Sequence, residues 1–127
     1  LLIAGVLDAE ELCGCAALAW SLGMEALVEV HTREELDIVK EAAIPDLLLG
    51  INNRDLKRQQ TRLEIFEELA PAGSRLSRLL VAESGIASAA DAERMRAAGA
   101  RALLVGESLL RADDPAAALR ALLGGGG

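Results

Sequence analysis

Residues 47–55 read LLLGINNRD, an apolar run that passes without interruption into four polar residues. Polar and apolar side chains do not alternate in the run 47–51, as they would in a strand with one face in water. Continuous apolarity is typical of a parallel strand that is covered on both faces. The stretch therefore predicts a buried parallel strand with polar groups at its carboxyl end.

Four further apolar runs of this kind lie on either side, at 1–7, 26–30, 79–82 and 102–105. Segments with helical periodicity separate them, and most begin with an oxygen-bearing residue followed three positions later by an acidic one. A strand–helix unit repeated about five times predicts an α/β fold with a parallel sheet, either a barrel or an open sheet. The predicted helix caps are Asp8, Thr32, Thr61, Ser88 and Asp114.

Composition and net charge predict one globular domain that does not bind nucleic acid. The chain has 127 residues, of which 52% are hydrophobic and 26% charged, as in one globular domain. Its net charge of −7, from 13 basic and 20 acidic residues, offers no broad basic surface, so we expect no nucleic-acid partner. A small anionic ligand remains compatible with this charge, because a few local donors can hold one phosphate.

The ends of the chain suggest a trimmed protein. It begins inside an apolar run without methionine, and it ends in four glycines. We expect residues 1–123 to form one portion of a domain and 124–127 a flexible tail. Apolar stretches stay shorter than the roughly 18 residues of a membrane span, which predicts a soluble protein.

Functional groups in parallel α/β folds gather at the carboxyl ends of the strands. Glu29 lies within an apolar run, where a carboxylate is unfavourable unless it is paired or belongs to a site. It is either a functional carboxylate or part of a structural ion pair, for instance with Arg54. Asn52 and Arg54, two residues apart on one predicted strand end, suit a carboxylate-binding fork or an internal salt bridge equally well. His31 is expected to have a structural or supporting role.

Two glycine-containing turns follow the last two strands: Glu83-Ser84-Gly85-Ile86 and Gly106-Glu107-Ser108-Leu109. Their backbone N–H groups could hold the phosphate of a sugar-phosphate substrate, as such turns do in many barrels. Alternatively, the glycines only permit tight turns.

Four strings, EALVEVH (25–31), GINNRDL (50–56), VAESGI (81–86) and VGESL (105–109), resemble indole-3-glycerol-phosphate synthase in order and spacing. The resemblance implies a (β/α)8 TIM barrel, of which this chain would supply strands four to eight. It implies an enzyme of tryptophan biosynthesis that closes the indole ring of carboxyphenylamino-deoxyribulose phosphate, with loss of carbon dioxide and water. No metal or organic cofactor is implied, and the compartment would be the cytoplasm, or the plastid stroma in a photosynthetic eukaryote.

By that resemblance the catalytic residues are Glu29 for proton transfer, Asn52 for positioning the anthranilate portion, and Glu83 for contacting the substrate. Arg54 would organise neighbouring charges, while Ser84, Gly85, Gly106 and Glu107 would hold the phosphate, mainly through backbone N–H groups.

The family's two catalytic lysines and another glutamate lie on its first three strands, and residues 58–63 depart from its pattern. We therefore expect a chain that is inactive alone and that docks with the missing part of the barrel or self-associates through open sheet edges. The alternative is a non-catalytic half-barrel that binds phosphate or a protein.

Overall fold

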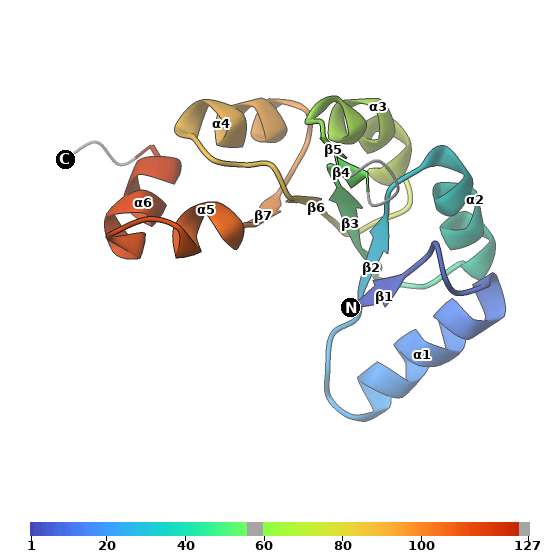
Figure 1. Cartoon of the computed structure of the whole chain (residues 1–127). Helices are drawn as coiled ribbons and strands as arrows, with labels where there is room; N and C mark the ends of the chain where they lie inside the picture. The colour runs from blue at the N-terminus through green and yellow to red at the C-terminus, as the bar shows by residue number, and fades with distance from the viewer. Residues whose placement is uncertain (56–59, 125–127) are drawn as a thin grey trace.

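The computed structural model describes residues 1–55 and 60–124 as a parallel sheet with helices between its strands (Figure 1). Five strands pair in the order β1-β2-β3-β6-β7 and all run parallel. Each strand of this sheet pairs with the next strand of the same sheet along the chain. The predicted α/β fold of about five consecutive parallel units is therefore confirmed. The sheet strands are β1 (Leu2–Ile3), β2 (Leu27–Val30), β3 (Leu48–Asn52), β6 (Leu79–Glu83) and β7 (Ala102–Leu104); the helices are α1 (Ala9–Ser21), α2 (Arg33–Ala42), α3 (Glu64–Gly73), α4 (Ala89–Ala97), α5 (Glu107–Leu110) and α6 (Pro115–Leu122).

Two glycines identify the two faces of the sheet. A Cβ atom on Gly73 of α3 would lie 3.1 Å from side-chain atoms of both Leu49 and Leu80, so these leucines face the helices. Leu49 and Leu80 are almost fully buried, and burial of each stabilises the fold by about 1.5–3 kcal/mol. A Cβ atom on Gly50 would instead meet the carboxyl group of Glu83. The face turned away from the helices therefore carries the acidic side chains.

Local capping chemistry sets most helix starts. Asp8 and Ser88 each form a complete capping box, and Asp114 accepts two backbone N–H groups ahead of Pro115. The hydroxyl of Thr32 also caps its helix, as predicted.

The predicted cap at Thr61 is wrong, because this residue lies in a strand. Thr61 pairs with Arg54 in a small antiparallel hairpin of β4 (Arg54–Asp55) and β5 (Gln60–Thr61), and α3 begins only at Glu64. The same hairpin corrects the prediction that Asn52 and Arg54 share one strand end. Asn52 ends β3, and its side-chain Oδ1 accepts the backbone N–H of Arg54 at 2.9 Å where the chain turns into β4.

The first strand is shorter than the predicted run 1–7. It spans Leu2–Ile3, after which a turn closes with a hydrogen bond from Val6 N–H to the Ile3 carbonyl. At the other end, residues 125–127 of the predicted glycine tail lie outside the described residues, as do residues 56–59. Within 1–55 and 60–124, none of the helices has the length and apolarity needed to cross a membrane.

Candidate active site

The three predicted catalytic residues lie at the carboxyl ends of neighbouring strands. Glu29 belongs to β2, Asn52 to β3 and Glu83 to β6, and Asn52 pairs in register with Glu83. All three are buried, with exposed fractions of 5%, 9% and 1%. The structure thus brings these polar groups together at the carboxyl ends of the strands, as the strand pattern predicts.

Glu29 and Glu83 form a pair of neighbouring carboxyl groups. Burial, followed by hydrogen bonding and charge repulsion with Glu29, raises the pKa of Glu83 to about 8. The Oε1 atom of Glu83 is buried and receives no hydrogen bond from the described residues, which disfavours a charge there. At neutral pH Glu83 is therefore mostly protonated and can act as a proton donor.

Gly50 provides the space for this pair. It pairs in register with Glu29, and a Cβ atom at this position would lie 1.7 Å from Glu83 Oε1 and 2.8 Å from its carboxyl carbon. Any side chain at position 50 would expel the Glu83 carboxyl group. The resemblance to the family includes Gly50, but its packing role is visible only in three dimensions.

His31 follows β2 and contacts two carboxylates. Its Nε2 lies 3.2 Å from Glu29 Oε1, and its Nδ1 lies 3.3 Å from Glu35 Oε2. The partner of Glu29 on this side is thus His31, whereas the ion pair considered from the sequence was with Arg54. Sequence reasoning missed Glu35, although its position four residues after His31, in the first turn of a helix, was a usable signal.

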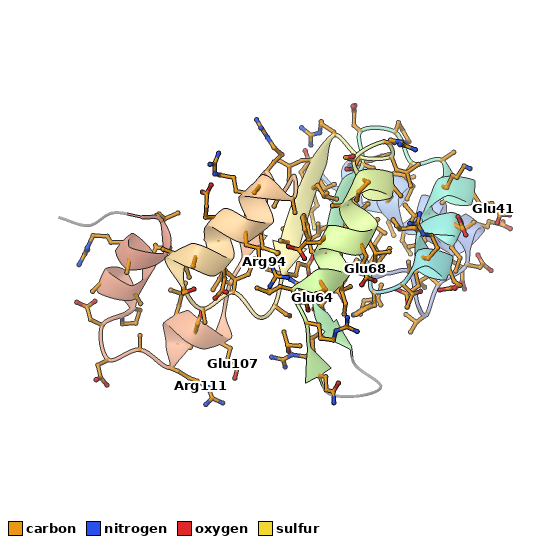
Figure 2. The ribbon with its side chains drawn as sticks, turned by 90° about the horizontal axis from the view of Figure 1, so that it is seen from above. Glu41, Glu64, Glu68, Arg94, Glu107 and Arg111 are labelled. Carbon is orange, nitrogen blue, oxygen red and sulfur yellow. The ribbon has the colours of Figure 1, made fainter. Side chains whose placement is uncertain are left out.

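Arg54 forms an ion pair with Glu107, which lies in the second of the two glycine-containing turns. Its Nη2 lies 2.7 Å from Glu107 Oε2, and Arg111 Nη2 lies 3.1 Å from Glu107 Oε1. Figure 2 shows Glu107 and Arg111 side by side at α5. Because these side chains are 40–79% exposed, the pairs are weak and can exchange for another anion.

A cavity of about 250 Å³ opens between the two glycine turns. The hydroxyl of Ser108 donates to the Ile86 carbonyl at 2.9 Å and so ties the turns together. Ser84 and Gly85 both have positive φ, 64° and 76°, which turns this backbone sharply at the cavity. All five predicted substrate-binding residues line it, together with six others: Arg54, Ser84, Gly85, Gly106 and Glu107, with Ile86, Ala87, Leu104, Val105, Ser108 and Arg111.

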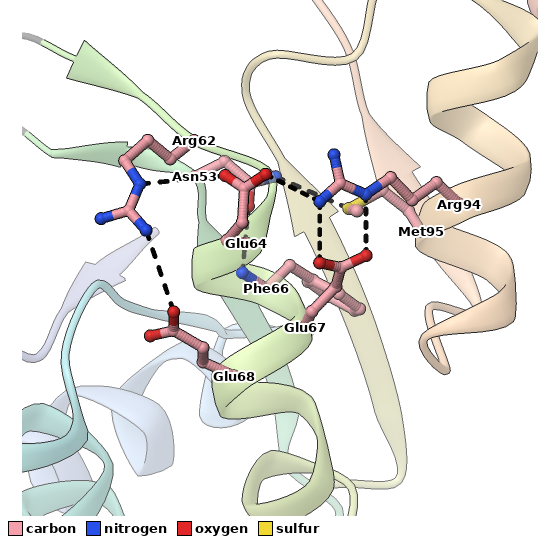
Figure 3. Close-up of polar contacts among 8 residues, drawn as sticks. All are labelled: Asn53, Arg62, Glu64, Phe66, Glu67, Glu68, Arg94 and Met95. Atoms are coloured by element: carbon pink, nitrogen blue, oxygen red, sulfur yellow. Dashed lines mark hydrogen bonds and ion pairs between the residues drawn. The ribbon is translucent and has the colours of Figure 1, made fainter.

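Asn53, beside the site, is a structural residue whose importance the sequence did not reveal. It is fully buried, and its Nδ2 donates to the Ser84 carbonyl at 3.1 Å. Its Oδ1 accepts the Phe66 backbone N–H at 3.1 Å, and its Nδ2 also contacts Met95 (Figure 3). These contacts join β3 to α3, α4 and the turn after β6. Asn53 therefore fixes the turn that lines the cavity.

A partly exposed ion-pair cluster joins the outer surfaces of α3 and α4. Arg94 donates to both carboxylate oxygens of Glu67, at 2.7 and 2.8 Å, and to Glu64 at 2.8 Å (Figure 3). These bonds lower the pKa of both glutamates. The cluster lies away from the carboxyl pair and has a structural role.

Comparison with known proteins places these features in a family. A family model described as indole-3-glycerol phosphate synthase matches residues 1–122. The chain is 55% identical over 108 residues to the indole-3-glycerol phosphate synthase of Azospirillum brasilense, a match that covers 85% of this chain and 39% of that protein. It is 46% identical over 114 residues to that of Shouchella clausii (strain KSM-K16), covering 90% and 44%.

A solved structure shares the fold. The chain matches one chain of the crystal structure of the Amycolatopsis orientalis BexX/CysO complex with a TM-score of 0.56 and 28% identity, over 93% of this chain and 49% of that one. This chain spans about two fifths of the length of the two curated relatives. The family whose model matches is a TIM-barrel family, and the five parallel units fit part of such a barrel. From the match over residues 1–122 and from both relatives, this chain belongs to the indole-3-glycerol phosphate synthase family.

Proposed function

We propose that this chain carries the carboxyl-terminal part of the active site of an indole-3-glycerol phosphate synthase. The reaction is closure of the indole ring of carboxyphenylamino-deoxyribulose phosphate, with release of carbon dioxide and water. The observation that carries the proposal is the Glu29–Glu83 carboxyl pair at the same strand ends as the cavity lined by all five predicted substrate-binding residues.

The carboxyl pair supplies acid and base from one site. Glu83, whose pKa is about 8, is protonated at neutral pH and is the proton donor. Glu29, by family resemblance, takes part in proton transfer beside it. Ring closure followed by dehydration needs both functions, because a proton leaves carbon and a hydroxyl group leaves as water.

The glycine turns hold the substrate's phosphate. Ser84 and Gly85 turn the backbone toward the cavity, and Arg54 and Arg111 lie at its mouth, where they are paired with Glu107. Phosphate can replace that carboxylate as the partner of the two guanidinium groups, because arginine binds both anions in a similar geometry.

Gly106 is a better position than Gly85 to test phosphate binding. A Cβ atom on Gly85 would lie 2.4 Å from Thr61 Cγ2, whereas Gly106 has open space and an ordinary negative φ. Gly106→Asp should therefore weaken sugar-phosphate binding by charge repulsion, while Gly106→Asn, its uncharged match, should retain it. Isothermal titration calorimetry of both variants checks this, and equal affinities would contradict the phosphate assignment.

The full reaction needs a partner segment. By family resemblance, two lysines and a further glutamate belong to strands that precede the five of this chain. Loss of a positioned acid typically lowers a rate by about 10²–10⁴-fold. The strands β1 and β7, which each pair with one neighbour in the described sheet, are the edges at which those strands would dock.

The test is to assay indole-glycerol-phosphate formation by the chain alone and after adding a separately expressed amino-terminal piece of a relative. We expect activity only in the mixture, and a Glu29→Gln variant of this chain should abolish it. Family-like turnover by the chain alone would overturn the partner requirement. A complex that forms but never turns over would favour the second function, a non-catalytic half-barrel.

A further inference from the structure

We propose that His31, held by Glu35, is a positioning residue that sets where the proton resides on the Glu29–Glu83 pair. Together the four groups form a proton path from the buried pair toward the surface. The catalytic consequence rests on the proposed function of Glu29, whereas the proton coupling can be measured without any reaction.

Glu35 fixes the orientation of the imidazole ring. One of its oxygens, Oε2, accepts the His31 backbone N–H at 2.6 Å and also lies 3.3 Å from the ring Nδ1. Burial alone would raise the pKa of Glu35, but the ring and backbone hydrogen bonds of His31 outweigh it, so that the pKa is lowered. Glu35 is therefore a carboxylate that only accepts hydrogen bonds, and it places a hydrogen on Nδ1.

The other ring nitrogen then faces Glu29. With Nδ1 occupied, the second proton of this contact resides either on Nε2, which gives an imidazolium at an ion-pair distance of 3.2 Å from Glu29 Oε1, or on the Glu29 carboxyl group. The proton on this contact thus has two alternative positions. Because Glu29 lies beside Glu83, a change of charge at His31 acts on both carboxyl groups.

Exposure increases steadily along the array. Glu83 is 1% exposed, and the side chains of Glu29, His31 and Glu35 are 7%, 10% and 17% exposed. The groups come from three elements: Glu83 from β6, Glu29 and His31 from β2 and the residue after it, and Glu35 from α2. A series of neighbouring side chains therefore leads from the most buried carboxyl group toward the most exposed one.

A glycine makes room for the outer end of the array, as Gly50 does for the inner end. A Cβ atom on Gly5, in the turn after β1, would lie 2.9 Å from Glu35 Oε1. Glu35 is consequently enclosed by this turn as well as by His31. In α1 and α4, which have complete capping boxes, the acidic side chain returns to the cap residue itself; in α2, which lacks one, the Glu35 carboxylate contacts His31 instead.

The chain is well suited to a direct test, because His31 is its one histidine. We would follow the imidazole proton and nitrogen resonances by NMR as a function of pH in the chain and in Glu29→Gln, Glu35→Gln and Glu83→Gln variants. The control is Glu41→Gln, the same change on an exposed residue of α2 that Figure 2 shows on the outer side of the helix.

We expect His31 to titrate at lower pH in the Glu29 and Glu35 variants, because each removes a negative charge that favours the imidazolium. We also expect the His31 titration curve to show two steps in the parent chain, because the carboxyl pair titrates beside it, and a single step in Glu83→Gln. The Glu41 variant should match the parent chain. If all four variants titrate as the parent does, His31 is only a structural residue and the inference is wrong.

A kinetic arm uses the chain mixed with the amino-terminal piece. His31→Asn should lower kcat about 10-fold with little change in KM and move the pH profile of kcat, because the substrate site is intact while the proton position is not. An unchanged pH profile would refute the positioning role. Failure of the parent mixture to react would count against the proposed function alone, since the NMR titration decides the coupling independently.

Discussion

Gly50 is the residue that allows two acidic side chains to meet on a sheet. Most strand positions could not tolerate a carboxyl group lying across the neighbouring backbone. Here the missing Cβ leaves the space that Glu83 Oε1 occupies. A glycine is usually unfavourable in a strand interior, and its presence is explained by this close approach.

The change Gly50→Ala should therefore disrupt the pair. We expect the free energy of unfolding to fall by about 1–3 kcal/mol from overpacking, and the pKa of Glu83 to return toward its ordinary value as its carboxyl group is displaced. Urea unfolding and carboxyl carbon NMR measure the two effects. Gly14→Ala is the control, since Gly14 lies in α1 with open space around it and alanine should be neutral or stabilising there.

The raised pKa of Glu83 makes stability depend on pH. Its folded value of about 8 lies above the ordinary 4.5, so the folded state binds more protons than the unfolded state between these values. Stability should therefore fall as pH rises from about 4.5 through about 8. Glu83→Gln should remove this slope in urea unfolding curves, whereas Glu68→Gln, at an exposed residue, should keep it. The same slope in both variants would contradict the coupled pair.

At the scale of elements, two kinds of contact hold α3 and α4 in place. Asn53 acts from inside, where its amide group bonds to a backbone N–H of α3 and to the carbonyl of the turn after β6. Arg94 acts from outside, where it bridges two glutamates in a partly exposed cluster. The buried hydrogen bonds of Asn53 should stabilise the fold more than the ion pairs of Arg94, because water competes with the ion pairs and not with the buried bonds.

Asn53→Ala should accordingly cost about 2–4 kcal/mol of unfolding free energy, since it leaves buried backbone groups without partners. Arg94→Ala should cost about 0–1 kcal/mol, because its side chain is 39% exposed. Denaturant unfolding of both variants at one pH gives the comparison. A larger loss for Arg94 would show that the outer cluster, and not the buried amide, holds the helices.

At the scale of the whole molecule, the five-stranded sheet has two edges. Strand β7 is paired in the described sheet with β6, and Leu104 in it is 51% exposed. An apolar side chain on an unpaired edge favours association with another chain. The same edge that would receive strands of a barrel can therefore receive a second copy.

We expect the isolated chain to associate as its concentration rises, and Leu104→Lys to reduce that association, because a charged edge strand disfavours pairing. Sedimentation velocity over a concentration series measures this. Leu110→Lys is the control, since Leu110 is 85% exposed but lies on α5 and not in a strand. A chain that is monomeric throughout, or equal effects of the two substitutions, would show that the edge does not drive association.

The sequence by itself determined the strand–helix order and the edge at which the polar groups gather. These features follow from local rules: uninterrupted apolar runs for strands buried on both faces, and capping pairs such as Asp8 with Glu11. Only the tertiary structure decided which groups meet, because partners from separate strands are chosen by register and space. Thus Glu29 contacts His31 and Glu83, while Arg54 turns away into a hairpin. Neither outcome is encoded in residue spacing, since both depend on the room left where a side chain is missing and on where the chain turns.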